Sequence, residues 1–217
     1  MNEIYQPDVP DRFNDEAIAK LSPSDPARTL VGLHESIAPL AQTIEDARAK
    51  IDADTTLSPQ GKLLAKQEVF GKTVAETIQA HSQPLRLAAL RVGEQSAALL
   101  KSAVAKSTVS EGRMLALASW LRDVPADARG RIVLAAIDDS DAETMAAILS
   151  APAIWNIATP LQREKAAAAL AQRHDPEKAA VLADMRVLIQ AIHESHESLG
   201  RYGRDKLCLK VLPAKAA

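Results

Sequence analysis

The sequence predicts an all-α protein, and three observations support that prediction. Aromatic residues make up only 3% of the 217 residues, so strand-forming side chains of this kind are scarce. Apolar residues recur at every third or fourth position over most of the chain, which is the spacing of one helix face. Several periodic segments begin with Ser, Thr or Asp followed by proline, a combination that favours the first turn of a helix.

Composition excludes several functional classes. Lys and Arg total 26 against 28 Asp and Glu, so a formal charge of -2 argues against a strongly basic nucleic-acid binder. No apolar run approaches the roughly 18 residues that a membrane span needs. The segment Met1–Asp8 lacks the basic and apolar regions of a signal peptide, and the single Cys208 fits a reducing compartment. We therefore expect the cytoplasm of the producing cell and no membrane contact.

Residues 1–24 are expected to form an extended N-terminal arm. They contain Pro7, Pro10 and Pro23 and few apolar residues. One short helix is predicted over Asn14–Leu21, because Asn14 can cap it and acidic residues follow in the first turn. Such an arm is expected to become ordered against a partner.

Residues 25–107 are predicted to form an elongated antiparallel helical hairpin. The first leg opens with Asp25-Pro26, and its apolar residues alternate by three and four positions without a break. This coiled-coil-like seam comprises Leu30, Leu33, Ile37, Leu40, Ile44, Ala47 and Ile51. Pro39 interrupts the pattern and is expected to kink the helix or split it in two.

The second leg of the predicted hairpin begins at Ser58-Pro59 and can run to about Lys106. Pro84 and Gly93 are expected to bend or break it. Its apolar stripe is Leu63, Phe70, Val74, Ile78, Leu85, Val92 and Leu99. The pattern leaves open whether the seam closes within one chain or between chains. In the second case Leu30, Leu33, Ile37, Leu40, Ile44 and Phe70 would be interface residues.

Residues 108–200 are predicted to form a compact bundle of short helices joined by short loops. Each segment has its own start signal. These signals are Ser110, Pro125, Ser140 with Glu143, Thr159 with Gln162, and Asp175-Pro176.

Residues 201–217 are predicted to form a basic C-terminal tail. Polar and apolar residues alternate over Lys206–Leu212, the only strand-like pattern in the sequence. A lone strand must pair with another chain, so Leu207, Leu209 and Val211 are further candidate interface residues. The tail lacks the interleaved aromatic residues that stack on bases, so a role in docking to a protein is favoured over nucleic-acid binding.

Residues His193–Glu197 form the densest cluster of potential metal ligands. His193, His196 and Glu197 lie three or four positions apart on one predicted helix, and with a third element they could hold a metal. The zinc-protease spacing is absent, and the alternative is a solvated helix end. Gly71-Lys72-Thr73 lacks the strand and upstream glycine of a P-loop. No catalytic or cofactor-binding residue is identified, and no cofactor is expected.

The turn Leu57-Ser58-Pro59-Gln60-Gly61-Lys62 leads into a long Ala-rich helix. This step resembles small helical proteins encoded in the structural modules of tailed bacteriophages and prophages. The resemblance covers one turn and the general style of the chain. It implies a virion or assembly component that acts through contacts, and it identifies no catalytic residue.

The sequence therefore favours a non-enzymatic structural or assembly protein with protein partners, as a homo-oligomer or in a larger assembly. The hairpin seam and the two termini would carry the contacts. One alternative is a helical adaptor, chaperone or regulator that binds one soluble partner. A third hypothesis is a metal-dependent helical-bundle enzyme that uses His193, His196 and Glu197.

Overall fold

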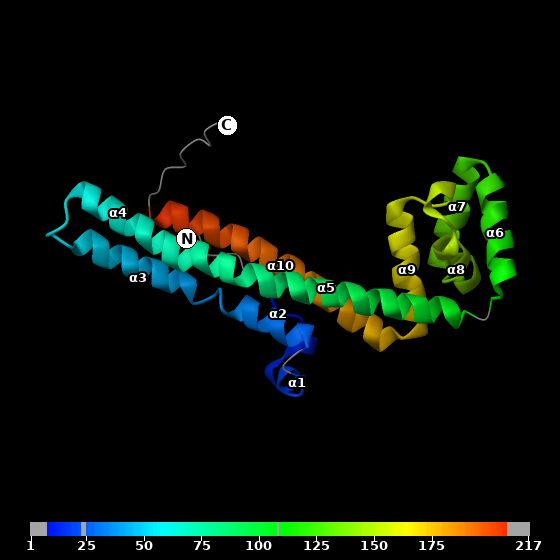
Figure 1. Cartoon of the computed structure of the whole chain (residues 1–217), viewed down its shortest axis with the longest axis horizontal. Helices are drawn as coiled ribbons and strands as arrows, with labels where there is room; N and C mark the ends of the chain where they lie inside the picture. The colour runs from blue at the N-terminus through cyan, green and yellow to red at the C-terminus, as the bar shows by residue number, and fades with distance from the viewer. Residues whose placement is uncertain (1–7, 23–24, 108, 208–217) are drawn as a thin grey trace. The chain divides into compact units, whose positions relative to one another are not determined.

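The computed structural model describes residues 8–22, 25–107 and 109–207 (Figure 1), and these are helical with no strand among them. The predicted all-α class is thereby confirmed. The longer helices are α1 (Asp15–Ala19), α2 (Pro26–Glu35), α3 (Leu40–Ala53), α4 (Pro59–Phe70), α5 (Glu76–Ala105), α6 (Glu111–Asp123), α7 (Ala126–Asp138), α8 (Ala142–Ser150), α9 (Pro160–His174) and α10 (Pro176–Lys206). Short segments are η1 (Asp11–Phe13), η2 (Gly71–Ala75) and η3 (Ala153–Trp155). No helix among the described residues is long and apolar enough to span a bilayer.

The chain divides into two units. Unit 1 comprises Met1–Val92 and Asp184–Ala217, and unit 2 comprises Gly93–Ala183. The boundaries expected after residues 107 and 200 differ from this division, because α5 and α10 each contribute one part to each unit. Start signals mark where a helix begins, but they do not show where its packing partners change.

The first leg is split at Pro39, as expected. Asp25 caps α2 by accepting a hydrogen bond from the Ala27 amide at 2.9 Å. The chain leaves the helix at Ser36, and α3 begins again immediately after Pro39. Proline has no amide hydrogen and clashes with the preceding turn, so a new helix start is the less costly arrangement.

The second leg remains helical from Pro59 to Ala105, so neither Pro84 nor Gly93, which were expected to bend or break it, ends the helix. Proline removes the hydrogen bond to the carbonyl four residues earlier, at Ala80. Ala80 is exposed, so water can satisfy that carbonyl, and packing of the rest of α5 outweighs the local cost. The irregularity lies instead at η2, a single stretch of π-helix between α4 and α5.

The predicted seam forms the core of unit 1. Leu30, Ile37 and Ile44 are 0% exposed in the single chain. Residues of η2, α5 and α10 in the same unit are buried too, namely Val74, Leu85, Val92, Leu188, Ile192 and Leu199. These three seam residues are therefore covered within one chain, in which α10 contacts α3 through the hydrogen bond from Tyr202 to Glu45.

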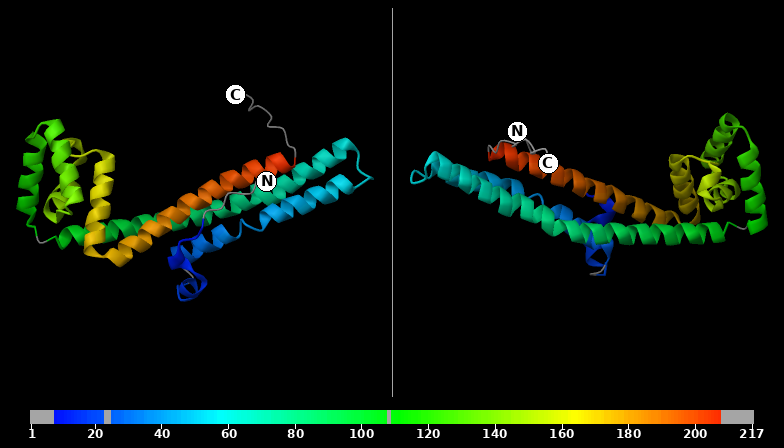
Figure 2. Two further views of the ribbon diagram at one scale, coloured as in Figure 1. Left: turned by 180° about the vertical axis from the view of Figure 1, so that it is seen from behind. Right: turned by 45° about the horizontal axis from the view of Figure 1, so that its top comes forward.

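Helix α10 runs antiparallel to α5 and α4 in unit 1 (Figures 1 and 2). Two contacts fix the register. The imidazole of His196 meets that of His81, with nitrogen atoms 3.0 Å apart. Seven residues further along α10, Gly203 lies against Val74, seven residues before His81. A Cβ atom on Gly203 would come within 2.9 Å of Val74 Cγ2 and 3.1 Å of Phe70 Cδ2, so the helices approach closely only because this residue is glycine.

The described part of the N-terminal segment is not an isolated arm. Asn14 caps α1 as predicted, by accepting a hydrogen bond from the Ala17 amide at 3.0 Å. Phe13 in η1 is only 5% exposed. The side chain of Arg12 forms an ion pair with Asp184 on α10, at 3.0 Å. Residues 8–22 thus belong to unit 1.

The boundary predicted at residue 201 was also wrong, because α10 continues to Lys206. Tyr202 and Leu207 are buried, and Glu45 of α3 accepts a hydrogen bond from the Tyr202 hydroxyl at 2.9 Å. Lys206 forms an ion pair with the same carboxylate at 2.7 Å. The start of the strand predicted over 206–212 is therefore a helix end. Leu209 and Val211 lie outside the described residues.

Unit 2 is built around α8. Its residues Thr144–Ile148 are all buried, with α6, α7 and α9 packed around them. The capping box of Thr159 and Gln162 forms at the start of α9 as predicted. Helix α8, however, is capped by Asp141 rather than by Ser140, since Ser140 adopts a positive φ of 54°.

The close contact at Gly203 predicts a pair of opposite mutational effects. Gly203→Ala should destabilise unit 1 by about 1–3 kcal/mol, because the added methyl group must displace Val74 and Phe70. The matched control is Gly32→Ala in α2, where no atom lies within 4 Å of the added carbon. That change should stabilise by about 0.5–1 kcal/mol through helix propensity. Chemical unfolding followed by circular dichroism measures both, and stabilisation by Gly203→Ala would contradict the close approach.

Candidate functional site

A chain of polar side chains crosses unit 1 at the break between α2 and α3. Ser36 follows α2, His81 lies on α5 and His196 lies on α10. The Ser36 hydroxyl is 3.2 Å from His81 Nε2, and His81 Nδ1 is 3.0 Å from His196 Nε2. The two rings are buried, with centroids 5.2 Å apart.

The hydrogen-bond partners assign a direction to this chain. The Ser36 hydroxyl donates to the carbonyl oxygen of Leu33 at 2.7 Å, so its oxygen accepts from His81 Nε2. His81 Nδ1 must then be the unprotonated nitrogen, and it accepts a hydrogen bond from His196 Nε2. In this assignment His81 Nδ1 can accept the hydrogen bond from His196 only while the His81 imidazole is neutral.

The electrostatics agree with neutral rings. Burial lowers the pKa of His81 below its ordinary value of 6.5. Burial, together with the nearby His81 and His193, lowers the pKa of His196 to about 4. Because His81 donates to Ser36, it cannot accept the hydroxyl proton, so the arrangement does not activate Ser36 as a nucleophile. The geometry is that of a structural polar bridge between helices.

The proposed metal-ligand set does not converge. His196 points inward to His81, whereas His193 and Glu197 are exposed on the outer side of α10. Within residues 8–22, 25–107 and 109–207 no three His, Cys, Asp or Glu side chains gather closely enough to hold a metal ion. The helical spacing put these residues near one another in the sequence, but it could not show that one of them belongs to the core.

A groove lies between α5 and α10 on the outer side of the histidine pair. It consists of two adjoining cavities of about 480 and 500 Å³ that share Ile78 and His196. On α5 the lining residues are Ile78, Ser82, Leu85, Arg86 and Ala89, and on α10 they are His193, His196, Glu197, Gly200, Arg201 and Arg204. Each set recurs at three- or four-residue steps, so each is one continuous helix face.

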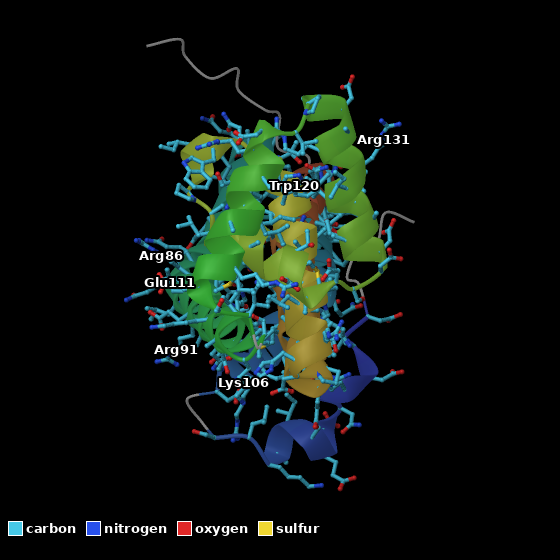
Figure 3. The ribbon with its side chains drawn as sticks, turned by 90° about the vertical axis from the view of Figure 1, so that its right-hand side faces the viewer. Arg86, Arg91, Lys106, Glu111, Trp120 and Arg131 are labelled. Carbon is cyan, nitrogen blue, oxygen red and sulfur yellow. The ribbon has the colours of Figure 1, made fainter. Side chains whose placement is uncertain are left out.

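The groove carries an excess of positive charge. Arg86, Arg201 and Arg204 face a single carboxylate, that of Glu197. Among the described residues none of these three guanidinium groups forms an ion pair. Arg86 projects away from the ribbon in Figure 3. The sequence did not reveal this site, since Arg86 is more than 100 positions from Arg201 and Arg204 along the chain.

In unit 2 the helices α6 and α9 and the short segment η3 each expose a large apolar side chain. The Arg122 guanidinium at the end of α6 lies 5.1 Å from the ring centroid of Trp155 in η3. Arg163 of α9 donates a hydrogen bond to the carbonyl of Ala151, just before η3, at 3.1 Å. These elements expose Ile154 (84%), Leu161 (61%) and Trp120 (51%), the last labelled in Figure 3. We call these three residues the apolar end of unit 2.

The predicted interface residues lie elsewhere. Leu30, Ile37, Ile44 and Leu207 are buried within unit 1. Leu33, Leu40 and Phe70 are half-buried, and Phe70 packs against Gly203 of α10. Their burial within one chain does not support an interface role. Periodicity identified them as buried positions, but it could not show that α10 would cover them.

Comparison with known proteins identified no similar protein. No family model, no curated protein and no solved structure matches this chain.

The buried histidine pair predicts a loss of stability in mild acid. A histidine with a lowered pKa binds its proton more readily when the chain is unfolded, so its contribution to folding is complete above pH 6.5 and declines toward pH 4. Between about pH 7.5 and about pH 5, His196 should reduce the free energy of unfolding by about 2 kcal/mol. Urea unfolding at these two pH values measures the change.

The matched variants are His196→Gln and His193→Gln. Glutamine at 196 retains a donor for His81 but cannot take up a proton, so most of the pH-dependent loss should vanish. His193 is exposed on the same helix and is the smallest of the three causes that lower the pKa of His196, so its replacement should leave most of the loss intact. Equal pH dependence in both variants would show that His196 is not the group responsible.

Proposed function

We propose that this chain is a non-enzymatic structural or assembly protein that acts through contacts with other protein chains, including further copies of itself. The observation that carries the proposal is the apolar end of unit 2. Monomeric proteins expose single apolar residues routinely, but a unit that exposes several large ones is a candidate contact surface. Tryptophan and isoleucine at such a site bury much apolar area when a partner covers them.

The polar side chains of unit 1 support the same proposal. The most organised polar cluster contains Ser36, His81 and His196, and its hydrogen-bond direction serves packing rather than proton transfer. The resemblance of residues 57–62 to phage structural-module proteins is the support for a virion component made in the cytoplasm of the producing cell. Within this proposal the contact surface shifts from the hairpin seam to unit 2.

A second candidate function is a helical adaptor, chaperone or regulator that binds one soluble partner. The observation that favours it is the groove between α5 and α10, which offers an apolar floor and three arginines without an ion pair to any described residue. The two candidates differ in self-association. The metal-dependent enzyme hypothesis has no such support, because His196 is committed to His81.

The apolar end of unit 2 predicts concentration-dependent self-association. Light scattering after size exclusion should give masses above the 23.2 kDa of one chain. Ile154→Glu should shift association to concentrations at least about tenfold higher, since a charge must then be buried in the contact. Val187→Glu is the matched control, because Val187 is 59% exposed on α10 in unit 1. A monomer at every concentration would contradict self-assembly and favour the adaptor.

The C-terminal segment can be tested separately from α10. Deletion of residues 201–217 would remove Tyr202 and Leu207 from the core of unit 1, so it would confuse folding with assembly. Deletion of residues 208–217 spares both. If Leu209 and Val211 contribute to a contact, this shorter deletion should weaken association while the helical circular dichroism signal of the described helices persists. Unchanged association would remove the tail from the assembly proposal.

A further inference from the structure

We propose that the groove between α5 and α10 in unit 1 binds an acidic amphipathic helix from a different protein. This inference goes beyond the proposed function, since it assigns a second binding site in the other unit and the chemistry of its ligand. Its basis is the combination of shape, apolar floor and unpaired charge described for the groove.

The floor of the groove suits apolar side chains. Ile78 is half-buried and Leu85 is only 4% exposed. Ala89 and Gly200 also line the groove, and their small size leaves room for a ligand side chain. The lining residues run from Ile78 to Ala89 on α5 and from His193 to Arg204 on α10, and each of these spans is about 16 Å of helix. A third helix can lie in such a depression between two helices, with one apolar stripe directed downward.

The arginines define where acidic residues of the ligand must lie. His81 is opposite His196, and Val74 is opposite Gly203, so Arg86 is level with Ala191 of α10. Arg201 and Arg204 are ten and thirteen residues further along α10, which places them about 15–20 Å from Arg86 along the groove. The ligand should therefore carry carboxylates near both ends and apolar residues between them. Arginine is suited to this task because its guanidinium binds a carboxylate through two hydrogen bonds.

The same features favour a peptide over a nucleic acid. A nucleic-acid groove presents aromatic side chains for base stacking, and none of the residues that line this groove is Phe, Tyr or Trp. Glu197 lies among the arginines and would repel a continuous row of phosphates. A helix with acidic ends can avoid Glu197, since its apolar middle faces that part of the groove.

The test uses the full chain and a fluorescein-labelled helical peptide of about 16 residues, long enough to reach both groups of arginines. The peptide has glutamates in its first and last turns. Between them, leucines at three- and four-residue spacing form one apolar stripe, and alanines fill the other positions. Fluorescence anisotropy should show saturable binding that weakens with added salt. The same peptide with lysine in place of every glutamate should bind at least about tenfold more weakly.

Charge-reversal variants locate the site. Arg86→Glu and Arg201→Glu change exposed side chains, and each should raise the dissociation constant by about tenfold or more. Arg131→Glu is the matched control, because Arg131 is an exposed arginine on α7 in unit 2, where Figure 3 shows it projecting outward. It should leave the dissociation constant unchanged. Ala89→Trp should also weaken binding by filling the floor without altering charge.

Three outcomes would overturn the inference. These are equal binding of the acidic and basic peptides, equal effects of the groove variants and Arg131→Glu, and tighter binding of a single-stranded DNA oligonucleotide with the same dependence on Arg86 and Arg201. The last outcome would reassign the groove to nucleic acid. None of them bears on self-association through Ile154, so failure here is distinguishable from failure of the proposed function.

Discussion

The contact of α10 with η2 and α5 is the constraint on which the rest of unit 1 depends. Gly203 allows the helix axes to approach until Val74 and Phe70 touch the α10 backbone. Leu30, Ile37 and Ile44 are fully buried in the same unit. The close approach also brings His196 to His81 and sets the two walls of the groove in register. One residue without a side chain therefore links the core, the polar bridge and the candidate binding site.

The polar bridge shows how a buried histidine pair can be tolerated. Burial penalises the charged imidazole, so each ring stays neutral and presents one donor and one acceptor. His196 then donates to His81, His81 donates to the Ser36 hydroxyl, and that hydroxyl donates to the Leu33 carbonyl where α2 ends. That carbonyl is one of the unpaired groups that every helix end leaves. The end of α2 before Pro39 thus leaves a carbonyl that the Ser36 hydroxyl binds, and His81 in turn binds Ser36.

Local rules in the sequence predicted the helices well and their partners poorly. Asp25, Ser58 and Thr159 cap the helices at the expected positions, because capping depends on atoms within three residues. Apolar periodicity likewise identified Leu30 and Ile37 as buried. It assigned no partner, since any apolar face of the right width satisfies the same pattern. At Lys206, the described start of the predicted strand, the chain is still helical, because Tyr202 and Leu207 pack into unit 1 at the end of α10.

The groove could not be predicted from the sequence, because it forms only where α5 and α10 pack side by side. Arg86 and Arg201 are far apart along the chain, and each reads as an ordinary surface residue on its own helix. Only the antiparallel register of α5 and α10 places them around one apolar floor. A solvated face would pair such arginines with nearby carboxylates, as Lys72 pairs with Glu68 on the same helical leg at 2.6 Å. Leaving three of them without an ion pair among the described residues keeps their capacity for carboxylates free. A surface of this kind costs little stability and gains its charge partners only when an acidic chain binds.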